Sequence, residues 1–152
     1  MPALRMERKM KIVAISGGFD PPHYGHYRYI EEALKLGDKL IIILTRDDQL
    51  IRKKGKVWIP YEDRKYMLEF LLKGKDKEFE VVQNIDEDLT SRKSIERYKP
   101  NIFAKGGDTW NIDSLPEKEI CEKLSIEIIF GVGGFKKDRG SSDIKDEEKE
   151  KV

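Results

Sequence analysis

Cysteine, histidine and net charge are all scarce in this chain of 152 residues. It contains one cysteine, two histidines, and 30 basic residues set against 29 acidic ones. A single cysteine excludes an internal disulfide, and balanced charge without a block of one sign disfavours a nucleic-acid partner. No apolar run approaches the roughly 18 residues that suggest a membrane helix, and nothing resembles a signal peptide. We therefore expect a cytoplasmic, single-domain protein with no membrane partner.

Both histidines, His23 and His26, lie in one stretch that reads S-G-G-F-D-P-P-H-Y-G-H over residues 16–26. An apolar, β-branched run typical of a buried strand precedes it, and apolar side chains at helical spacing follow it. Open α/β sheets bind ligands at such turns, beyond the carboxyl end of a strand. Gly17 and Gly18 would let a phosphate approach the backbone, and the helix N-terminus would supply oriented N–H groups. A glycine-rich turn can also merely connect two elements.

The stretch also fits a longer pattern, G-x-F-D-x-x-H-x-G-H. Its specified positions are Gly17, Phe19, Asp20, His23, Gly25 and His26. This pattern resembles the signature of the cytidylyltransferase-like nucleotidyltransferases, the superfamily of glycerol-3-phosphate cytidylyltransferase and heptose-1-phosphate adenylyltransferase. The resemblance implies that the two histidines are catalytic and that the other signature residues, with Gly18, bind the nucleotide. Nicotinate-mononucleotide adenylyltransferases have a similar signature with one more residue before the phenylalanine, which counts against that branch.

Strand-like segments recur along the chain, at residues 11–15, 39–45, 79–83, 101–105 and 126–130. Each is followed by a helix or a turn, which indicates an α/β fold with a doubly wound, Rossmann-like parallel sheet of five strands. The resemblance implies the strand order 3-2-1-4-5, with the site between strands one and four. We expect a loose lead-in over residues 1–10, one nucleotidyltransferase domain over residues 11–145, and a charged tail over residues 146–152.

The basic stretch R-K-K-G-K at residues 52–56 would be a solvated surface loop on composition alone. The resemblance instead implies a mobile segment that closes over the nucleotide phosphates, with Lys54 and Lys56 as the best matches and Lys53 as a further candidate. Arg64 lies near the start of the next predicted helix, where the resemblance implies that it faces the same phosphates. Without the resemblance, Arg64 could simply pair with an acidic neighbour on the surface.

Two stretches nearer the C-terminus complete the expected nucleotide site. The sequence K-G-G-D at residues 105–108 is similar to a loop of the heptose-1-phosphate enzymes, and the tryptophan two residues after Asp108 is similar to the glycerol-3-phosphate enzymes. From this loop, Gly107 and Asp108 are expected to contact the nucleotide. Ser141 and Ser142 correspond to a hydroxyl-bearing run that holds phosphates in the family, although a glycine replaces the first hydroxyl here.

The reaction implied by these residues needs no covalent catalysis. No Ser–His–Asp or Cys–His set can be assembled, and Cys121 falls on the inner face of a predicted helix as a packing residue. A phosphate-ester acceptor is already a nucleophile, so in-line positioning and charge stabilisation suffice. Mg²⁺ on the phosphates suits that chemistry, with no residue assigned to it. The acidic turn at residues 86–88 matches no metal-ligand spacing and is expected to be solvated.

The function that we expect is transfer of CMP from CTP to a small phosphorylated alcohol or sugar, with release of pyrophosphate. The tryptophan spacing favours CTP, and the comparable enzymes are short single-domain chains, whereas heptose-type domains are often fused to a kinase. ATP with a sugar phosphate is the first alternative, favoured by the K-G-G-D stretch. A nucleotide-binding module without turnover is the second alternative. The expected partners are a nucleoside triphosphate, a phosphorylated small molecule and, as an option, a second copy in a homodimer.

Overall fold

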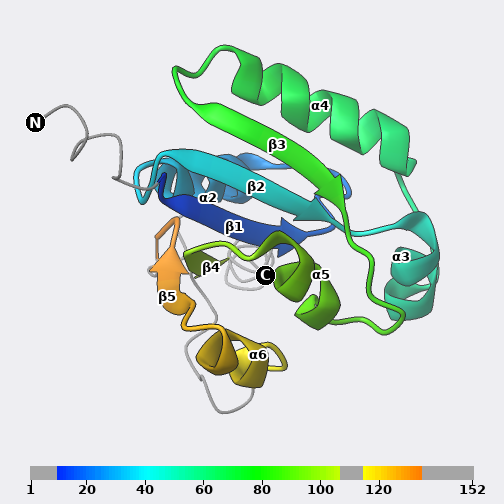
Figure 1. Cartoon of the computed structure of the whole chain (residues 1–152). Coiled ribbons are helices and arrows are strands. Elements are labelled where there is room, and N and C mark those ends of the chain that lie inside the picture. Colours follow the sequence, from blue (N-terminus) through cyan, green and yellow to red (C-terminus); the bar gives the residue numbers. More distant parts are fainter. Residues whose placement is uncertain (1–9, 107–114, 135–152) are drawn as a thin grey trace, which may run out of the picture.

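The structure is a computed structural model that describes residues 10–106 and 115–134. Its elements are β1 (Ile12–Gly17), α2 (Tyr24–Leu34), β2 (Lys39–Leu44), α3 (Asp47–Lys54), α4 (Tyr61–Lys73), β3 (Glu78–Gln83), α5 (Arg92–Tyr98), β4 (Ile102–Gly106), α6 (Lys118–Lys123) and β5 (Glu127–Val132). The five strands form one sheet in the order β3-β2-β1-β4-β5, and every neighbouring pair is parallel. This arrangement confirms the expected doubly wound fold and places β1 beside β4 at the switch in strand order (Figure 1).

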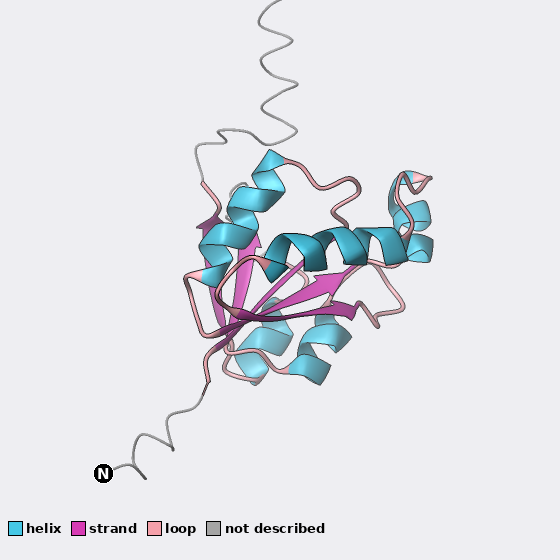
Figure 2. Cartoon of the chain, turned by 90° about the horizontal axis from the view of Figure 1, so that it is seen from above, coloured by secondary structure: helices cyan, strands magenta, loops and turns pink. Residues whose placement is uncertain are grey.

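Helices cover both faces of the sheet, as Figure 2 shows from above. Because side chains alternate along a strand, Val13 and Ile15 of β1 join the core under α2 and α4, whereas Ala14 joins the core under α5 and α6. Cys121 of α6 is fully buried in that second core, and burial raises the pKa of its thiol to about 11. The cysteine is therefore a packing residue, as predicted.

Two helices differ from the sequence-based expectation in ways that matter for the site. α2 begins at Tyr24, so His26 lies inside its first turn rather than in the preceding loop. α3 runs as far as Lys54, so Lys53 and Lys54 belong to a helix and not to a loop. Acidic residues in the first turn of α3 and basic residues in its last turn complement the helix dipole. Gly55 then ends the helix in the left-handed conformation, at φ +87°.

In the acidic turn after β3, Asp86 is buried, contrary to the expectation that the whole turn would be solvated, whereas Glu87 is exposed. Asp86 accepts hydrogen bonds from the backbone N–H groups of Lys93 (2.7 Å) and Ser94 (2.9 Å), near the start of α5. Its carboxylate also accepts the Ser94 hydroxyl at 2.8 Å. Asp86 thus satisfies N–H groups that the first turn of a helix leaves unpaired. The side chain of the N-cap residue, Ser91, makes no capping hydrogen bond itself.

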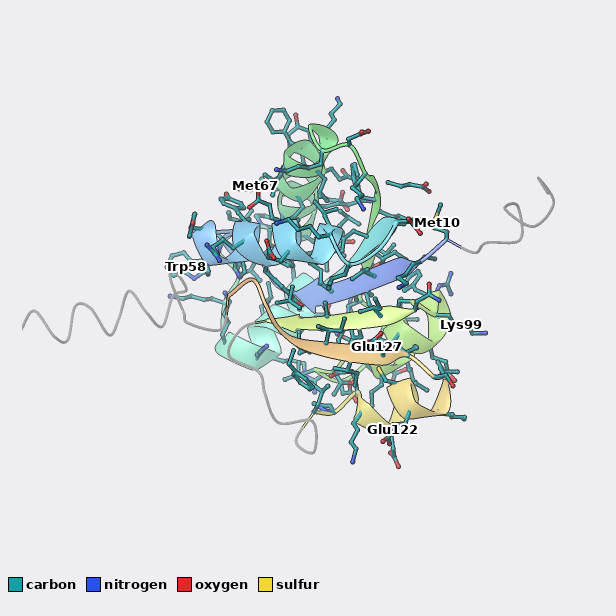
Figure 3. All side chains as sticks on the ribbon, turned by 90° about the vertical axis from the view of Figure 1, so that its left-hand side faces the viewer. Met10, Trp58, Met67, Lys99, Glu122 and Glu127 are labelled. Carbon is teal, nitrogen blue, oxygen red and sulfur yellow. The ribbon has the colours of Figure 1, made fainter. Side chains whose placement is uncertain are left out.

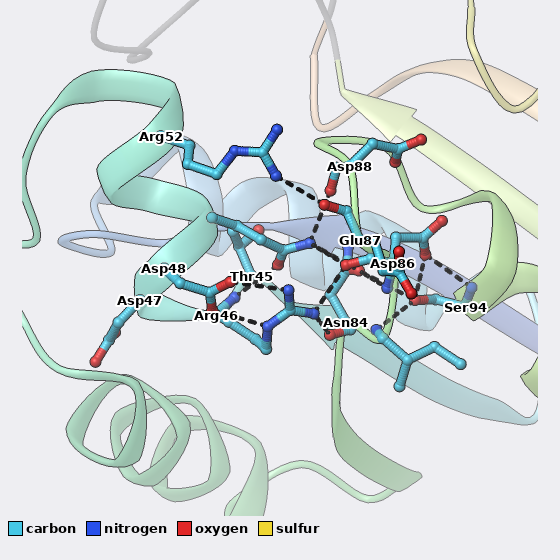
Figure 4. A network of polar contacts seen from close by, with 12 residues as sticks. Thr45, Arg46, Asp47, Asp48, Arg52, Asn84, Asp86, Glu87, Asp88 and Ser94 are labelled. Atoms are coloured by element: carbon cyan, nitrogen blue, oxygen red, sulfur yellow. Dashed lines mark hydrogen bonds and ion pairs between the residues drawn. The ribbon is translucent and has the colours of Figure 1, made fainter.

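The same turn also fixes the position of α3, in the polar network of Figure 4. The buried amide of Gln49 donates to Asn84 Oδ1, to the Asp86 carbonyl and to the Asp88 carbonyl, each at 3.1 Å. Arg46, which precedes α3, donates to the carbonyl oxygens of Asn84 (2.6 Å) and Asp86 (2.9 Å). The helix that carries Lys53 and Lys54 is therefore anchored to the carboxyl end of β3.

Across the described ranges, no helix is both long and apolar enough to pass through a membrane.

Replacing Asp86 by alanine should lower the free energy of unfolding by about 2–3 kcal/mol, because two helix N–H groups and a buried hydroxyl lose their acceptor. Urea denaturation of the wild type and the variant measures the difference. Glu87→Ala is the matched control, since Glu87 is the neighbouring, exposed carboxylate. Equal losses in the two variants would contradict a specific capping role for Asp86.

Candidate active site

The two histidines cap the N-terminus of α2 and fix each other's orientation. His23 Nδ1 accepts the Gly25 N–H at 3.1 Å, and His26 Nδ1 accepts the His23 N–H at 3.2 Å. The rings stack with their centroids 3.8 Å apart. Because each Nδ1 is an acceptor, the neutral form of each imidazole carries its proton on Nε2. The arrangement therefore presents two parallel rings whose Nε2–H groups can donate to a phosphate oxygen.

Both imidazoles are neutral near pH 7. Burial, and then the charge of His23, lowers the pKa of His26 to about 4. Burial also lowers the pKa of His23 below its ordinary value of 6.5. Near pH 7 the pair can therefore offer hydrogen bonds, but no positive charge, to an anionic group.

The turn between β1 and α2 is shaped by Phe19, whose ring is buried and meets His26 edge-on at a centroid distance of 4.8 Å. Its φ of +48° lies in the left-handed region, which bulky residues seldom adopt. The glycines before it leave room for this packing, because a Cβ on Gly18 would lie 2.9 Å from Leu50 and one on Gly17 would lie 3.1 Å from Phe19 itself. The Phe19 ring thus packs against the His26 ring and restricts its position.

Asp20 holds the lysine-bearing segment against the signature. Its side chain is only 1% exposed, and its two oxygens accept the backbone N–H groups of Trp58 (2.8 Å) and Ile59 (2.6 Å). Lys54 Nζ forms an ion pair with the same carboxylate at 3.1 Å and donates to the Asp20 carbonyl at 3.0 Å. Burial would raise the pKa of Asp20, but these N–H groups and the ammonium outweigh it and lower the pKa. Asp20 is therefore a carboxylate engaged by the protein.

Arg64 also holds the lysine-bearing segment in place, through the carbonyl of Ile59. The guanidinium is 0% exposed and donates to the carbonyl oxygens of Ile59 (2.7 Å), Gly18 (2.8 Å) and Thr45 (2.8 Å). It also forms an ion pair with Asp47 at 2.7 Å. Four of its five N–H groups are bonded and the side chain is buried, so the structure does not direct Arg64 toward an incoming phosphate as the resemblance implied. Burial of a charged group is costly, and here it is compensated by hydrogen bonds to the residues that follow β1 and β2 and by the ion pair with α3.

A cavity of about 270 Å³ opens above this turn. It is lined by Gly18, Phe19, Asp20, Pro21, His23, His26, Leu50, Lys53 and Lys54. The structure thus brings the histidines together with Lys54, as the sequence predicted, and adds Lys53. Lys56 lies apart from this lining, with its ammonium 4.1 Å above the ring of Trp58, which projects from the edge of the molecule (Figure 3).

Lys53 had been only a further candidate in the sequence. Lys53 lies three positions after Leu50, which packs beside Gly18. The helical period of α3 therefore puts Leu50 and Lys53 on the same face, toward the signature. That period was hidden because the basic composition of residues 52–56 suggested a loop.

Four predicted nucleotide contacts, Gly107, Asp108, Ser141 and Ser142, lie outside the described residues. Within the described ranges, no group of three or more His, Cys, Asp or Glu side chains is placed to hold a metal ion. No described residue is thus assigned to the Mg²⁺ that the resemblance implied.

Comparison with known proteins agrees with this fold. The cytidylyltransferase-like family matches residues 14–132. The chain is 33% identical to the FAD synthase of Pyrococcus horikoshii over 90% of this chain and 89% of that protein. It is 35% identical to the bifunctional protein HldE of Hahella chejuensis over 82% of this chain and 23% of that protein. The lipopolysaccharide core biosynthesis protein of Thermoplasma volcanium matches with a TM-score of 0.62 and 25% identity, over 80% of this chain and 96% of that chain.

A strand–helix junction with paired histidines, in a five-stranded parallel sheet, defines the class of the protein as a nucleotidyltransferase. The chain belongs to the cytidylyltransferase-like family, which confirms the resemblance found in its sequence.

The pKa of His26 predicts how stability depends on pH. The pKa is about 4 in the folded protein and near 6.5 in an unfolded chain. Between those values the unfolded chain binds a proton that the folded chain does not, so the free energy of unfolding falls as the pH decreases from about 6.5 toward 4. His26→Gln should make this decline shallower, as measured by urea denaturation near pH 7 and near pH 5. An equally steep decline in the variant would mean that other groups set the acid limit.

Asp20→Asn should loosen the lysine-bearing segment, because the amide offers one acceptor oxygen in place of two and no charge for Lys54. We expect trypsin to cleave after Lys54 and Lys56 about tenfold faster than in the wild type, as expected for loss of a charged hydrogen bond. Mass spectrometry of timed digests identifies these cleavages. Asp76→Asn changes an exposed carboxylate and should leave the digestion pattern unchanged. Wild-type cleavage rates in Asp20→Asn would refute the holding role.

Proposed function

We propose that this nucleotidyltransferase moves an adenylyl group from ATP to a phosphate monoester, and that FMN is the favoured acceptor. The observation that carries this proposal is the match to FAD synthase along nearly the full length of both chains. FMN is the phosphate ester of the ribityl alcohol on flavin, so it falls within the acceptor class expected from the sequence.

The reaction joins FMN to AMP by one new bond. A phosphate oxygen of FMN attacks the α-phosphorus of ATP, the bond from that phosphorus to the bridging oxygen of the β-phosphate breaks, and pyrophosphate leaves. The attacking phosphate is largely dianionic near pH 7, so no side chain has to remove a proton. The protein contributes alignment of the three groups and stabilisation of the negative charge that spreads in the transition state.

The site residues suit these tasks. We assign the Nε2–H groups of His23 and His26 to the α-phosphate, because they are preorganised and neutral. Lys53 and Lys54 line the cavity, and we assign Lys54 to the departing phosphates, with Lys56 arriving from the adjoining segment. Mg²⁺, carried by the triphosphate, would neutralise part of the charge on it.

Other residues would act through position or through the backbone. Asp20 and Arg64 are proposed to position the lysines, and Phe19 is proposed to position His26. Gly17, Gly18 and Gly25 would let the phosphates approach the main chain. Gly107, Asp108, Ser141 and Ser142 keep the nucleotide-binding role that the resemblance implies.

CTP as donor and a sugar phosphate as acceptor form the second candidate. The spacing between Asp108 and Trp110 favours CTP, and the match to HldE shows that the relatives are not all FAD synthases. A cytoplasmic location and a homodimer also remain proposals. Exposed apolar side chains on α4, such as Tyr66 and Phe70, are a candidate surface for a second copy.

The proposal is tested by measuring pyrophosphate release with ATP or CTP against FMN, glycerol 3-phosphate and heptose 1-phosphate, in the presence of Mg²⁺. We expect ATP with FMN to be the most active pair and the product to be FAD. His23→Ala and His26→Ala should each lower kcat by roughly 10²–10³-fold, as loss of a preorganised donor does elsewhere. Faster turnover with CTP, or with either of the other acceptors, would replace the proposed substrates.

A further inference from the structure

A second cavity of about 210 Å³ lies at the carboxyl edge of the sheet. Its floor is formed where β1, β2 and β3 end, at Gly17, Thr45 and Asn84. Glu117, just before α6, forms part of its wall. Lys53 lines both this cavity and the one above the histidines, so the two cavities adjoin at that side chain.

Glu117 is a buried polar group in this wall with one oxygen to which the described residues donate no hydrogen bond. It is 5% exposed, and one of its oxygens accepts the backbone N–H of Ser91 at 2.8 Å. Among the described residues, the other oxygen accepts no hydrogen bond, and Glu117 forms no ion pair. By contrast, the neighbouring amides of Gln49 and Asn84 are already bonded to the protein. A buried carboxylate is costly unless hydrogen-bond donors surround it.

We infer that this second cavity is the acceptor subsite, with Lys53 at the phosphate end and Glu117 receiving O–H or N–H groups at the far end. The inference rests on the proposed function and names the part of the acceptor that the protein recognises. The acceptor phosphate then lies at the boundary of the two cavities, next to the nucleotide that the histidines hold. Hydroxyl groups of a ribityl chain or a sugar, or a ring N–H, satisfy the free oxygen of Glu117.

The same placement sets a selectivity. The charge of Glu117 disfavours a carboxylate or second phosphate directly beside it, although the cationic Lys105 also lines this cavity. The cavity has room for a sugar or a ribityl chain but not for a flavin ring as well. With FMN, the ring would therefore extend over the rim, where Leu89 is 46% exposed.

The kinetic test compares Glu117→Gln with the wild type, using ATP, Mg²⁺ and FMN. The variant keeps an oxygen for the Ser91 N–H but loses the charge, so we expect the KM for FMN to rise about tenfold or more, with the KM for ATP and kcat within about twofold. Glu119→Gln makes the same change on the exposed face of α6 and should match the wild type. An unchanged KM for FMN, or an equal rise for ATP, overturns the subsite.

A binding test needs no turnover and uses a surface residue that does not affect folding. Flavin fluorescence titrations give the affinities for FMN and for riboflavin, which lacks the phosphate. Lys53→Ala should weaken binding of FMN about tenfold or more and leave riboflavin unchanged, because only FMN has a charge for the ammonium. Lys73→Ala, also in the last turn of a helix, is the control. Equal effects on both flavins, or none, overturn the assignment of Lys53.

The two hypotheses fail in different ways. If the wild type converts FMN but the Glu117 and Lys53 variants match it, the function stands and the subsite is wrong. If the wild type binds FMN through these residues but forms no FAD, the subsite stands and the proposed function is wrong. If the wild type neither binds nor converts FMN, both are wrong.

Discussion

The site depends on one residue, Ile59, being held through both its N–H and its C=O. The N–H of Ile59 is bound by Asp20, and its carbonyl is bound by Arg64. Since Arg64 also holds Gly18, the segment after α3 is tied to the loop that carries the histidines. Removing charged side chains such as Asp20 and Arg64 from water costs free energy, and hydrogen bonds and ion pairs within the protein have to compensate that cost. The arrangement gives the lysines a defined position relative to the imidazoles.

Charge and geometry are supplied by different elements of the site. The histidine pair is part of a helix cap and is rigid, because its Nδ1 atoms are bonded to the backbone. The lysines are longer and more exposed, so they suit groups that change position during a reaction, such as a departing pyrophosphate. Anchoring α3 through Gln49 and Arg46 ensures that Lys53 and Lys54 start from a fixed helix. In the proposed reaction, the fold thereby separates orientation of the α-phosphate from neutralisation of the other phosphates.

Local patterns in the sequence predicted the parallel sheet and the place of the histidines, because strand periodicity and the signature are local features, and the resemblance to the family supplied the strand order. They did not predict the direction of charged side chains. Arg64 and Asp86 have sequence neighbours typical of a surface, yet both are buried. Arg64 bonds to Asp47, which lies 17 positions away along the chain, and Asp86 bonds to Lys93 and Ser94, which lie 7 and 8 positions away. The end of α3 was missed because its basic composition hid a helical period. Tertiary contacts decided each of these cases.

The neutral histidine pair has a consequence for the thermodynamics of nucleotide binding. A triphosphate placed against these rings brings negative charge, which favours their protonated forms and raises both pKa values. Binding of the nucleotide is then coupled to uptake of protons from the solvent. If the histidines hold the triphosphate as proposed, the binding enthalpy should vary with the ionisation enthalpy of the buffer, and the affinity should strengthen as the solution becomes more acidic, until the triphosphate itself is protonated.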